Sequence, residues 1–307
     1  MRYADVGVDR AKASRFIRFL KSAVPRRKDV LAGVGAFSGV VRWPRGGAGL
    51  AATCDGVGTK LLVACRMGGR AHEVIGWDAV AMNVNDLVAE GARPLGFLDY
   101  LAMGRLSNPV ARAIARGAAA ACRASSTAFL GGETAEMPGL YRRAEYDLAG
   151  FAVGATGARG PITGREIRPG DALIGLPSDG LHSNGYSLVR RIIPPAELAR
   201  RRREFFRPTR LYVGPVLGLL SRMRPAGLAH ITGGGLVENL ERILPSGCRV
   251  ELDAARWGVP PLFRELARRG RIPPGELARV FNLGIGFVVV VRAGDAEKTV
   301  KVLRSAG

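Results

Sequence analysis

The segment at residues 73–91 constrains the fold more than any other part of the chain. Its apolar side chains recur almost all round at helical spacing, as Val74, Ile75, Val80 and Val84 illustrate. A helix that is apolar on every side must be covered on every side, so this segment predicts an interior helix. Burying it requires a large core, and a chain of 307 residues is long enough for two domains.

Polar side chains interrupt this apolar helix on one face. Asp78, Met82, Asn85 and Asp86 fall at positions i, i+4, i+7 and i+8, which places them within about a quarter-turn of one another. Burying a carboxylate costs several kcal/mol unless it is paired or bound to a metal. Two interpretations follow: contact with a metal or nucleotide, or structural pairing with arginine or backbone N–H groups.

Strand and helix patterns alternate along the rest of the chain and divide it into two parts. In the first, strands are expected at 50–54, 95–103, 126–130 and 147–156, and a helix at 109–124. The turn-forming sequence Ala158-Arg159-Gly160-Pro161 then predicts a boundary. In the second part, strands are expected at 171–176, 228–231, 248–252 and 281–291, and helices from 186 and near 209–223, 236–243 and 260–269. We therefore predict a mixed α/β fold with domains at 1–158 and 159–307.

Composition excludes several classes of protein. No apolar run approaches the roughly 20 residues that a membrane span requires, and the first residues lack a secretory signal, so a cytoplasmic protein is expected. The four cysteines and three histidines are scattered, which argues against a zinc site. The net charge of +20 favours anionic ligands. Its two dense runs, 26–28 and 200–203, are not interleaved with aromatic residues, so we expect solvated surfaces and not a nucleic-acid interface.

Four glycine-rich or polar clusters follow predicted strands, where ligand groups gather in α/β folds. Asp55-Gly56-Val57-Gly58-Thr59-Lys60 offers backbone N–H groups and a lysine for phosphate, and a carboxylate for Mg²⁺; the alternative is a plain glycine turn. Residues 131–139, GGETAEMPG, offer Glu133 and Glu136 as metal ligands or bases; the alternative is a turn with two solvated acids.

The two remaining clusters lie in the second half. Residues 178–188 form a loop with His182, Ser183 and Asn184 that leads into a helix, so it either binds a polar substrate or caps that helix. Residues 230–239 place Thr232 and three glycines before another helix, as a phosphate site or a tight turn. A further glycine-rich segment, 33–39, is either a loop that closes over triphosphate or a linker.

Together these clusters resemble the phosphoribosylformylglycinamidine cyclo-ligase family, also called aminoimidazole ribonucleotide synthetases. The similarity runs from Tyr3 to about Phe287 and consists of ordered motifs: YADVGVD at 3–9, DGVGTK at 55–60, N-x-N-D at 83–86, GGETAEMPG at 131–139, HSNGYSLVR at 182–190 and TGGGLVEN at 232–239. Six ordered motifs are far more specific than any single glycine loop.

The resemblance implies an ATP-dependent ring closure in purine biosynthesis. ATP phosphorylates the formyl amide oxygen of formylglycinamidine ribonucleotide, a neighbouring amine attacks the activated carbon, and phosphate leaves to give aminoimidazole ribonucleotide. It also implies Mg²⁺ and a homodimer in which the N-terminal sheets form a β-barrel that spans both subunits, with the active clefts near that interface. Besides a second copy of the chain, the expected partners are the phosphorylated ribonucleotide and ATP, without nucleic acid or membrane.

The same resemblance implies which residues form each part of the site. His182, Asp86 and Lys60 are expected to be catalytic, and Asp55, Asp86 and Glu133 to bind the metal. The expected nucleotide-binding residues are Asp55, Gly56, Gly58, Thr59, Lys60, Asp78, Asn85, Asp86 and Glu133. The expected substrate-binding residues are His182, Ser183, Asn184, Thr232, Gly233, Gly234 and Gly235.

Two features qualify the resemblance. The family continues for a few strands beyond position 307, so the far edge of the C-terminal sheet is expected to be incomplete. Related ATP-using enzymes, such as thiamine-monophosphate kinase, selenophosphate synthetase and the hydrogenase-maturation enzyme, are the nearest alternatives. The kinases typically place an aspartate where this chain has His230, and segment 33–39 lacks the cysteine of selenophosphate synthetase.

Overall fold

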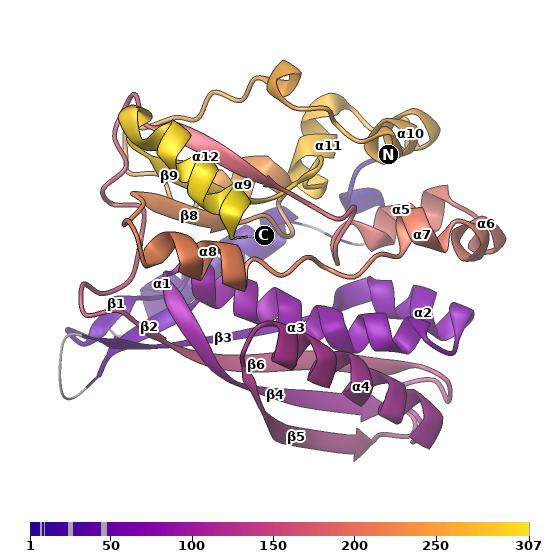
Figure 1. Cartoon of the computed structure of the whole chain (residues 1–307). Coiled ribbons are helices and arrows are strands. Elements are labelled where there is room, and N and C mark those ends of the chain that lie inside the picture. The colour runs from indigo at the N-terminus through magenta and orange to yellow at the C-terminus, as the bar shows by residue number, and fades with distance from the viewer. Residues whose placement is uncertain (7, 9, 24–26, 44–47, 307) are drawn as a thin grey trace.

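The fold consists of two β-sheets with helices packed around and between them (Figure 1). The computed structural model describes residues 1–6, 8, 10–23, 27–43 and 48–306. Gly7 and Asp9 of the opening motif lie outside these residues. Within the described part of the chain, no helix is both long enough and apolar enough to cross a membrane.

The first half of the chain builds a six-stranded sheet in the order β1-β2-β3-β6-β4-β5. All neighbours pair antiparallel except β4 and β5, which are parallel and joined through a helix. The strands are β1 (Val30–Ala32), β2 (Gly39–Arg42), β3 (Gly49–Gly56), β4 (Ala92–Met103), β5 (Ala128–Glu136) and β6 (Tyr146–Thr156).

Helices α3 (Ala71–Ala89) and α4 (Asn108–Ala124) cross each other in very close contact. A methyl group added at Gly76 would lie 1.9 Å from the carbonyl oxygen of Ile114, and one added at Gly117 would lie 1.8 Å from that of Glu73. The two backbones therefore touch, and only glycine fits at either point.

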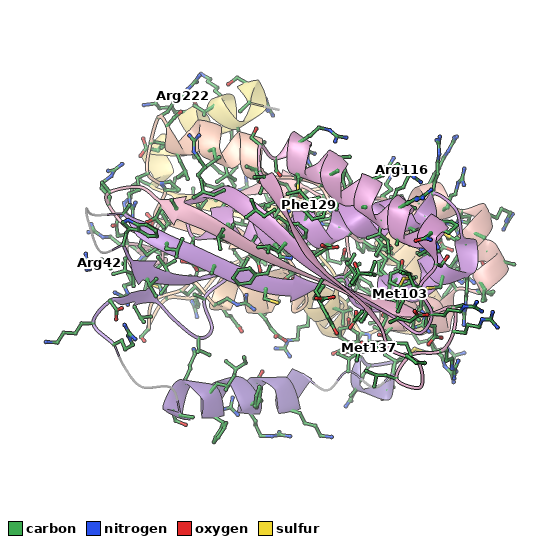
Figure 2. The ribbon with its side chains drawn as sticks, turned by 90° about the horizontal axis from the view of Figure 1, so that it is seen from below. Arg42, Met103, Arg116, Phe129, Met137 and Arg222 are labelled. Atoms are coloured by element: carbon green, nitrogen blue, oxygen red, sulfur yellow. The ribbon has the colours of Figure 1, made fainter. Side chains whose placement is uncertain are left out.

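The opposite face of this sheet, here called the outer face, remains exposed (Figure 2). Strand β6 shows why: Tyr146, Leu148 and Ala152 are buried, whereas the alternate residue Phe151 is 42% exposed. Strand β5 has exposed side chains along nearly its whole length and forms the edge of the sheet. The sheet therefore has one buried face and one open face.

The second half builds a three-stranded antiparallel sheet in the order β7-β9-β8. Its strands are β7 (Ala172–Pro177), β8 (Gly227–His230) and β9 (Ile285–Val291). The other helices of the chain are α1 (Arg10–Ala23), α2 (Leu61–Met67), α5 (Tyr186–Ile192), α6 (Pro195–Arg200), α7 (Arg202–Phe205), α8 (Val213–Leu220), α9 (Gly235–Glu241), α10 (Pro261–Gly270), α11 (Pro274–Val280) and α12 (Ala296–Ser305).

The predicted interior helix is confirmed. Helix α3 packs on β3, β4 and β6 on one side and on β8 and α8 on the other, so it lies between the two halves. Fifteen of its 19 residues are buried, which explains why apolar residues occupy nearly every face.

Three expectations about secondary structure are wrong. Residues 248–252 form no strand, because no neighbouring backbone pairs with them among the described residues. Residues 209–212 are not helical, and the helix expected from 209 begins at Val213. Glycines 131 and 132 do not end a strand, since β5 continues through them to Glu136.

Candidate functional site

Two carboxylates from different elements meet where α3 faces β3. Asp55 lies near the end of β3, and Asp86 lies in the last turns of α3 with a 9% exposed surface. The pKa of Asp55 is raised to about 7, chiefly by burial and next by the negative charge of Asp86, while the Gly56 N–H group and Arg242 act in the opposite direction. These two acids, here called the acid pair, are thus like charges held close together in a shielded place.

His230 connects the acid pair to the second half. Its Nδ1 atom lies 2.7 Å from Oδ1 of Asp86, and its side chain is fully buried at the end of β8. The ring also lies near Asn85, with 3.5 Å between Nε2 and Nδ2. His230 therefore fixes the orientation of Asp86 relative to the smaller sheet.

The other predicted acid of α3, Asp78, has a structural environment. Its Oδ2 atom lies 2.6 Å from Nζ of Lys60, and both side chains are fully buried. Its Oδ1 atom accepts the Thr209 N–H at 2.6 Å, and Lys60 also donates to the Arg207 carbonyl at 2.6 Å. Contact between Lys60 and a phosphate would require this ion pair to open, so the arrangement matches the structural interpretation of Asp78.

Residues 207–212 form an extended segment that α3 holds along its polar face. Asn85 donates to the Arg210 carbonyl at 2.9 Å and accepts the Tyr212 N–H at 2.9 Å. Trp77 donates from Nε1 to the Thr209 carbonyl at 2.8 Å. We call the contacts of Lys60, Trp77, Asp78 and Asn85 with this segment the clamp. The clamp joins the two halves of the chain, and its partner segment was not predicted from the sequence.

The glycine turn after β3 is open to solvent. Gly58 has a φ of +68° and an exposed backbone, with no atom within 4 Å of an added methyl group. Thr59 lies 3.0 Å from Ser187, hydroxyl to hydroxyl, so the turn also contacts α5. Gly56 and Gly58 therefore leave backbone accessible to an anion next to the acid pair.

His182 is an interior residue and neither caps a helix nor faces solvent. It is 1% exposed with a φ of +58°, and its Nε2 atom accepts the Asp179 N–H at 3.2 Å. Burial lowers the pKa of His182 well below its ordinary value, and the charges of His230 and Lys60 lower it further, so the ring is neutral. Its Nδ1 atom has no hydrogen-bond partner among the described residues.

The two residues that follow His182 differ in their burial. The Ser183 hydroxyl lies 3.1 Å from that of Thr209, and Asn184 is only partly buried. Any contact of substrate with this loop is therefore more direct at Asn184 than at His182.

The glycine turn at 232–235 is packed tightly. Gly235 has a φ of +59°, and an added methyl group would lie 2.0 Å from the Ala278 carbonyl of α11. Asn239 donates to the carbonyls of Thr232 at 3.3 Å and Gly235 at 2.8 Å. Close packing therefore accounts for Gly235, whereas Thr232 and Gly233 keep partial exposure.

Glu133 does not join the acid pair within one chain. Asp55 shares a row across the sheet with Gly150, Asp99 and Gly132, and that row points to the inner face. Glu133 is the next residue, so it points to the outer face, and Gly132 is already three strand spacings, about 14 Å, from Asp55. Consistently, no group of three potential metal-binding side chains occurs in the described part of the chain.

Two further residues near the acid pair were not predicted from the sequence. Glu90 is 3% exposed and lies four residues beyond Asp86, and its pKa is raised to about 8, chiefly by burial and in part by the charge of Asp86. Arg242 follows α9, and its charge acts on both Asp55 and Glu90. The i+4 spacing from Asp86 was a signal for Glu90; no local signal pointed to Arg242.

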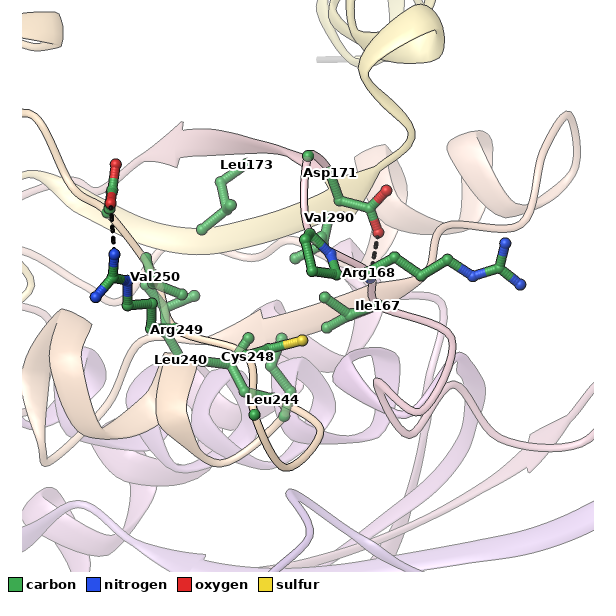
Figure 3. Close-up of a pocket in the computed structure, with 15 residues that line it drawn as sticks. Ile167, Arg168, Asp171, Leu173, Leu240, Leu244, Cys248, Arg249, Val250 and Val290 are labelled. Atoms are coloured by element: carbon green, nitrogen blue, oxygen red, sulfur yellow. Dashed lines mark hydrogen bonds and ion pairs between the residues drawn. The ribbon is translucent and has the colours of Figure 1, made fainter.

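Two of the cavities differ in their relation to these residues. One of about 450 Å³ lies beside β7 and is lined by Leu173, Leu240, Cys248 and Val290 among others, with none of the predicted site residues (Figure 3). Another, of about 550 Å³, is lined by loop residues 33–37, Glu90 and Arg242. Only the second adjoins the surroundings of the acid pair.

Comparison with known proteins gives consistent matches over the whole chain. Residues 35–156 match the family "AIR synthase related protein, N-terminal domain", and residues 168–307 match "AIR synthase related protein, C-terminal domain". The phosphoribosylformylglycinamidine cyclo-ligase of Desulfitobacterium hafniense (strain DSM 10664 / DCB-2) is 45% identical over 99% of this chain and 93% of its own. That of Paraburkholderia phymatum is 44% identical over 99% and 89%.

Solved structures with this fold are more distant in sequence. Thiamine-monophosphate kinase from Stenotrophomonas maltophilia K279a has a TM-score of 0.62 at 23% identity, covering 95% of this chain and 88% of that one. A structure described as "AaThiL complexed with AMPPCP and TMP" has a TM-score of 0.65 at 20% identity, covering 96% and 88%. These likenesses support the mixed α/β fold.

Proposed function

This chain belongs to the phosphoribosylformylglycinamidine cyclo-ligase family, and we propose that it performs that family's reaction. It is an ATP-dependent ligase of purine biosynthesis that converts formylglycinamidine ribonucleotide to aminoimidazole ribonucleotide. The observation that carries this conclusion is identity of 44–45% across 99% of the chain. The two solved structures compared above, which share the fold, are only 20–23% identical.

The reaction balances as two displacements. The formyl amide oxygen attacks the γ-phosphorus of ATP and releases ADP. A neighbouring nitrogen then attacks the activated carbon, forms the ring C–N bond and, after loss of a proton, expels inorganic phosphate. The chain's task is to hold the two substrates so that the oxygen meets phosphorus and the nitrogen meets carbon.

The acid pair fits Mg²⁺. Asp55 and Asp86 are oxygen ligands of like charge, close enough for one to raise the pKa of the other, and a divalent cation would relieve that repulsion. When bound, Mg²⁺ would offset triphosphate charge. Arg242 is within electrostatic reach of Asp55, and the open backbone of Gly58 follows Asp55 by three residues, so both support a triphosphate there.

The substrate assignments follow the exposed members of each motif. Asn184, Thr232 and Gly233 are partly accessible, so we assign substrate contact to them. His182, Ser183, Gly234 and Gly235 are buried, so they shape the wall behind these residues. Lys60, Asp78 and Asn85 maintain the clamp and thereby the position of α3.

We further propose a homodimer formed through the outer face of the six-stranded sheet, giving a barrel that spans both subunits. The apolar side chains exposed there support this: Leu95 is 49% exposed, Leu130 is 61% and Phe151 is 42%. The edge strand β5 adds unpaired backbone. In such a dimer Glu133 would lie in the barrel between the two sheets, whereas the acid pair lies on the inner face of its own sheet.

The chain divides, in this proposal, into an N-terminal ATP- and Mg²⁺-binding and dimerisation domain, 1–158, and a C-terminal α/β domain, 159–307. The division between the two sheets supports this boundary. We also propose that the enzyme is cytoplasmic and acts on small molecules, not on nucleic acid or membranes.

The direct test is to incubate the purified protein with formylglycinamidine ribonucleotide, ATP and Mg²⁺. We expect aminoimidazole ribonucleotide and ADP in equal amounts. ATP consumption with thiamine monophosphate instead, and no aminoimidazole product, would refute the function.

A further inference from the structure

The cavity of about 550 Å³ beside the glycine-rich loop has an unusual concentration of positive charge. Four cationic side chains from separate segments line it: Lys21, Arg27, Arg165 and Arg242. Lys21 lies on α1, and Arg27 follows that helix along the chain. Arg165 lies in the segment that connects β6 to β7, and Arg242 follows α9. The volume suits a small-molecule ligand and is too small for a nucleic-acid duplex.

The negative charge in this wall is limited. Arg27 forms an ion pair with Asp29 at 2.7 Å, so its charge is partly balanced. Glu90 is the acid that lines the cavity, and its raised pKa, about 8, keeps it mostly protonated at pH 7. The wall therefore carries a net positive charge that favours an anion.

The cavity adjoins the acid pair through Arg242. The guanidinium group of Arg242 lies over the Phe37 ring, 4.5 Å from its centroid. Its charge also lowers the pKa of both Asp55 and Glu90, so it is within electrostatic reach of the two places. A ligand in the cavity would therefore lie next to a triphosphate held at the acid pair.

The base of the loop contains polar atoms that a ligand or water would satisfy. Glu90 accepts the Phe37 N–H through Oε1 at 3.1 Å, which holds the loop in place. Its Oε2 atom and the Ser38 hydroxyl are buried without a hydrogen-bond partner among the residues that the structure describes. Buried polar groups are nearly always paired, and Glu90 lines the cavity, so its unpaired oxygen indicates an incomplete site there.

We propose that this cavity binds the sugar phosphate of the ribonucleotide substrate, with Lys21, Arg165 and Arg242 as its cationic partners. The proposal rests on the cyclo-ligase function. In that function the triphosphate has Mg²⁺, held by the acid pair, to offset its charge, whereas the phosphate monoester has no metal of its own. It therefore needs protein cations, and guanidinium groups match phosphate geometry well.

Arg165→Gln tests the proposal at an exposed position, where the fold does not depend on the side chain. We expect the KM for the ribonucleotide to rise about tenfold or more, the loss of one charge-assisted hydrogen bond, while the KM for ATP stays within about twofold. Arg168→Gln is the matched control: it removes the same charge from an exposed residue three positions along, which lines a different cavity. It is expected to change neither KM.

A binding measurement separates this proposal from the enzyme assignment. Calorimetric titration of ribose 5-phosphate, without ATP, is expected to show weaker binding to Arg165→Gln than to the wild type. If the KM for ATP rises instead, the cavity holds triphosphate and the proposal is overturned; unchanged KM values for both substrates also overturn it. If the wild type makes no product but loses ribose 5-phosphate binding on Arg165→Gln substitution, the phosphate site stands and the cyclo-ligase function fails.

Discussion

Helix α3 carries two aspartates, Asp78 and Asp86, whose surroundings differ in almost every respect. They are eight residues apart, about 12 Å along the helix axis. Asp78 has no exposed surface and meets the cation of Lys60 and the N–H of Thr209. Asp86 keeps 9% exposure, contacts His230 and lies near the acids Asp55 and Glu90.

This difference indicates a structural role for Asp78 and a ligand-binding role for Asp86. The clamp neutralises Asp78, so this end of α3 stabilises the junction of the two halves. The acid pair concentrates like charge, which costs stability in the free protein and is useful only if a cation arrives. In the sequence both residues are the same signal, an aspartate on an apolar helix, and the distinction comes from partners far away in the chain.

Substitution of Asp86 should produce the largest effect, and it should fall on turnover. We expect Asp86→Asn to lower kcat about a thousandfold, because a metal ligand contributes several kcal/mol of charge stabilisation. The melting temperature should stay the same or rise, since one member of a repelling pair has lost its charge. Steady-state kinetics and calorimetry together test this, and near-normal turnover in the folded variant would remove Asp86 from the metal site.

Breaking the clamp should instead lower the stability of the protein. Lys60→Met leaves Asp78 buried without its cation and should lower the free energy of unfolding by about 3–5 kcal/mol. Denaturant titration measures the loss. In the double variant Lys60→Met/Asp78→Leu much of it should return, because no charge remains buried; a Lys60→Met protein as stable as the wild type would contradict the structural role of the pair.

The acid-pair region should also make stability depend on pH. The pKa values of Asp55, about 7, and Glu90, about 8, both lie above their ordinary values of 3.8 and 4.5. The folded state thus binds these protons more tightly than the unfolded state, so stability is greatest at acidic pH and is lost as pH rises towards 8.

Glu90→Gln isolates one part of that dependence. Measured by thermal unfolding with a chelator present, the variant should lose less stability than the wild type between pH 6 and 8.5, by roughly 1–3 kcal/mol. Glutamine keeps an acceptor for the Phe37 N–H. Parallel curves for the two proteins would show that Glu90 does not titrate in this range.

The smallest effect is expected within the clamp. Trp77→Phe removes the hydrogen bond from Nε1 to the Thr209 carbonyl, 2.8 Å long, and keeps most of the ring packing. The free energy of unfolding should fall by about 1 kcal/mol with turnover unchanged. A marked loss of turnover would show that the clamp also positions catalytic groups.

The sequence predicted the parts of the fold that local patterns encode. Helix α3 and strands β4 and β6 lie close to their expected positions because their periodicity is strong over many residues. The segment 248–252 has a strand-like sequence but lacks a hydrogen-bonded neighbour, and pairing is not a local property. The two glycines of β5 lie at a bulge, where Gly131 has a φ of +123° and a methyl group added at Gly132 would lie 2.1 Å from the Asp99 carbonyl oxygen, contacts that appear only in three dimensions.

The candidate site was predictable in its components but not in their arrangement. Asp55 and Asp86 come together as expected, while Glu133 points away from them across the sheet. Lys60 was expected at a phosphate, and the structure instead pairs it with Asp78, whose position 18 residues later gives no local hint of contact. Burial of His182 likewise depends on packing against Tyr212, from a distant segment.

The glycine crossing of α3 and α4 acts as a pivot. Gly76 lies ten residues before Asp86, so the contact point and the carboxylate are separated by about 15 Å of nearly rigid rod. A methyl group at Gly76 or Gly117 would tilt that rod, and a tilt of only a few degrees would swing its far end by about an ångström, the scale on which catalytic geometry fails. The position of the Asp86 carboxylate thus depends on two glycines, Gly76 and Gly117, at the distant contact between α3 and α4.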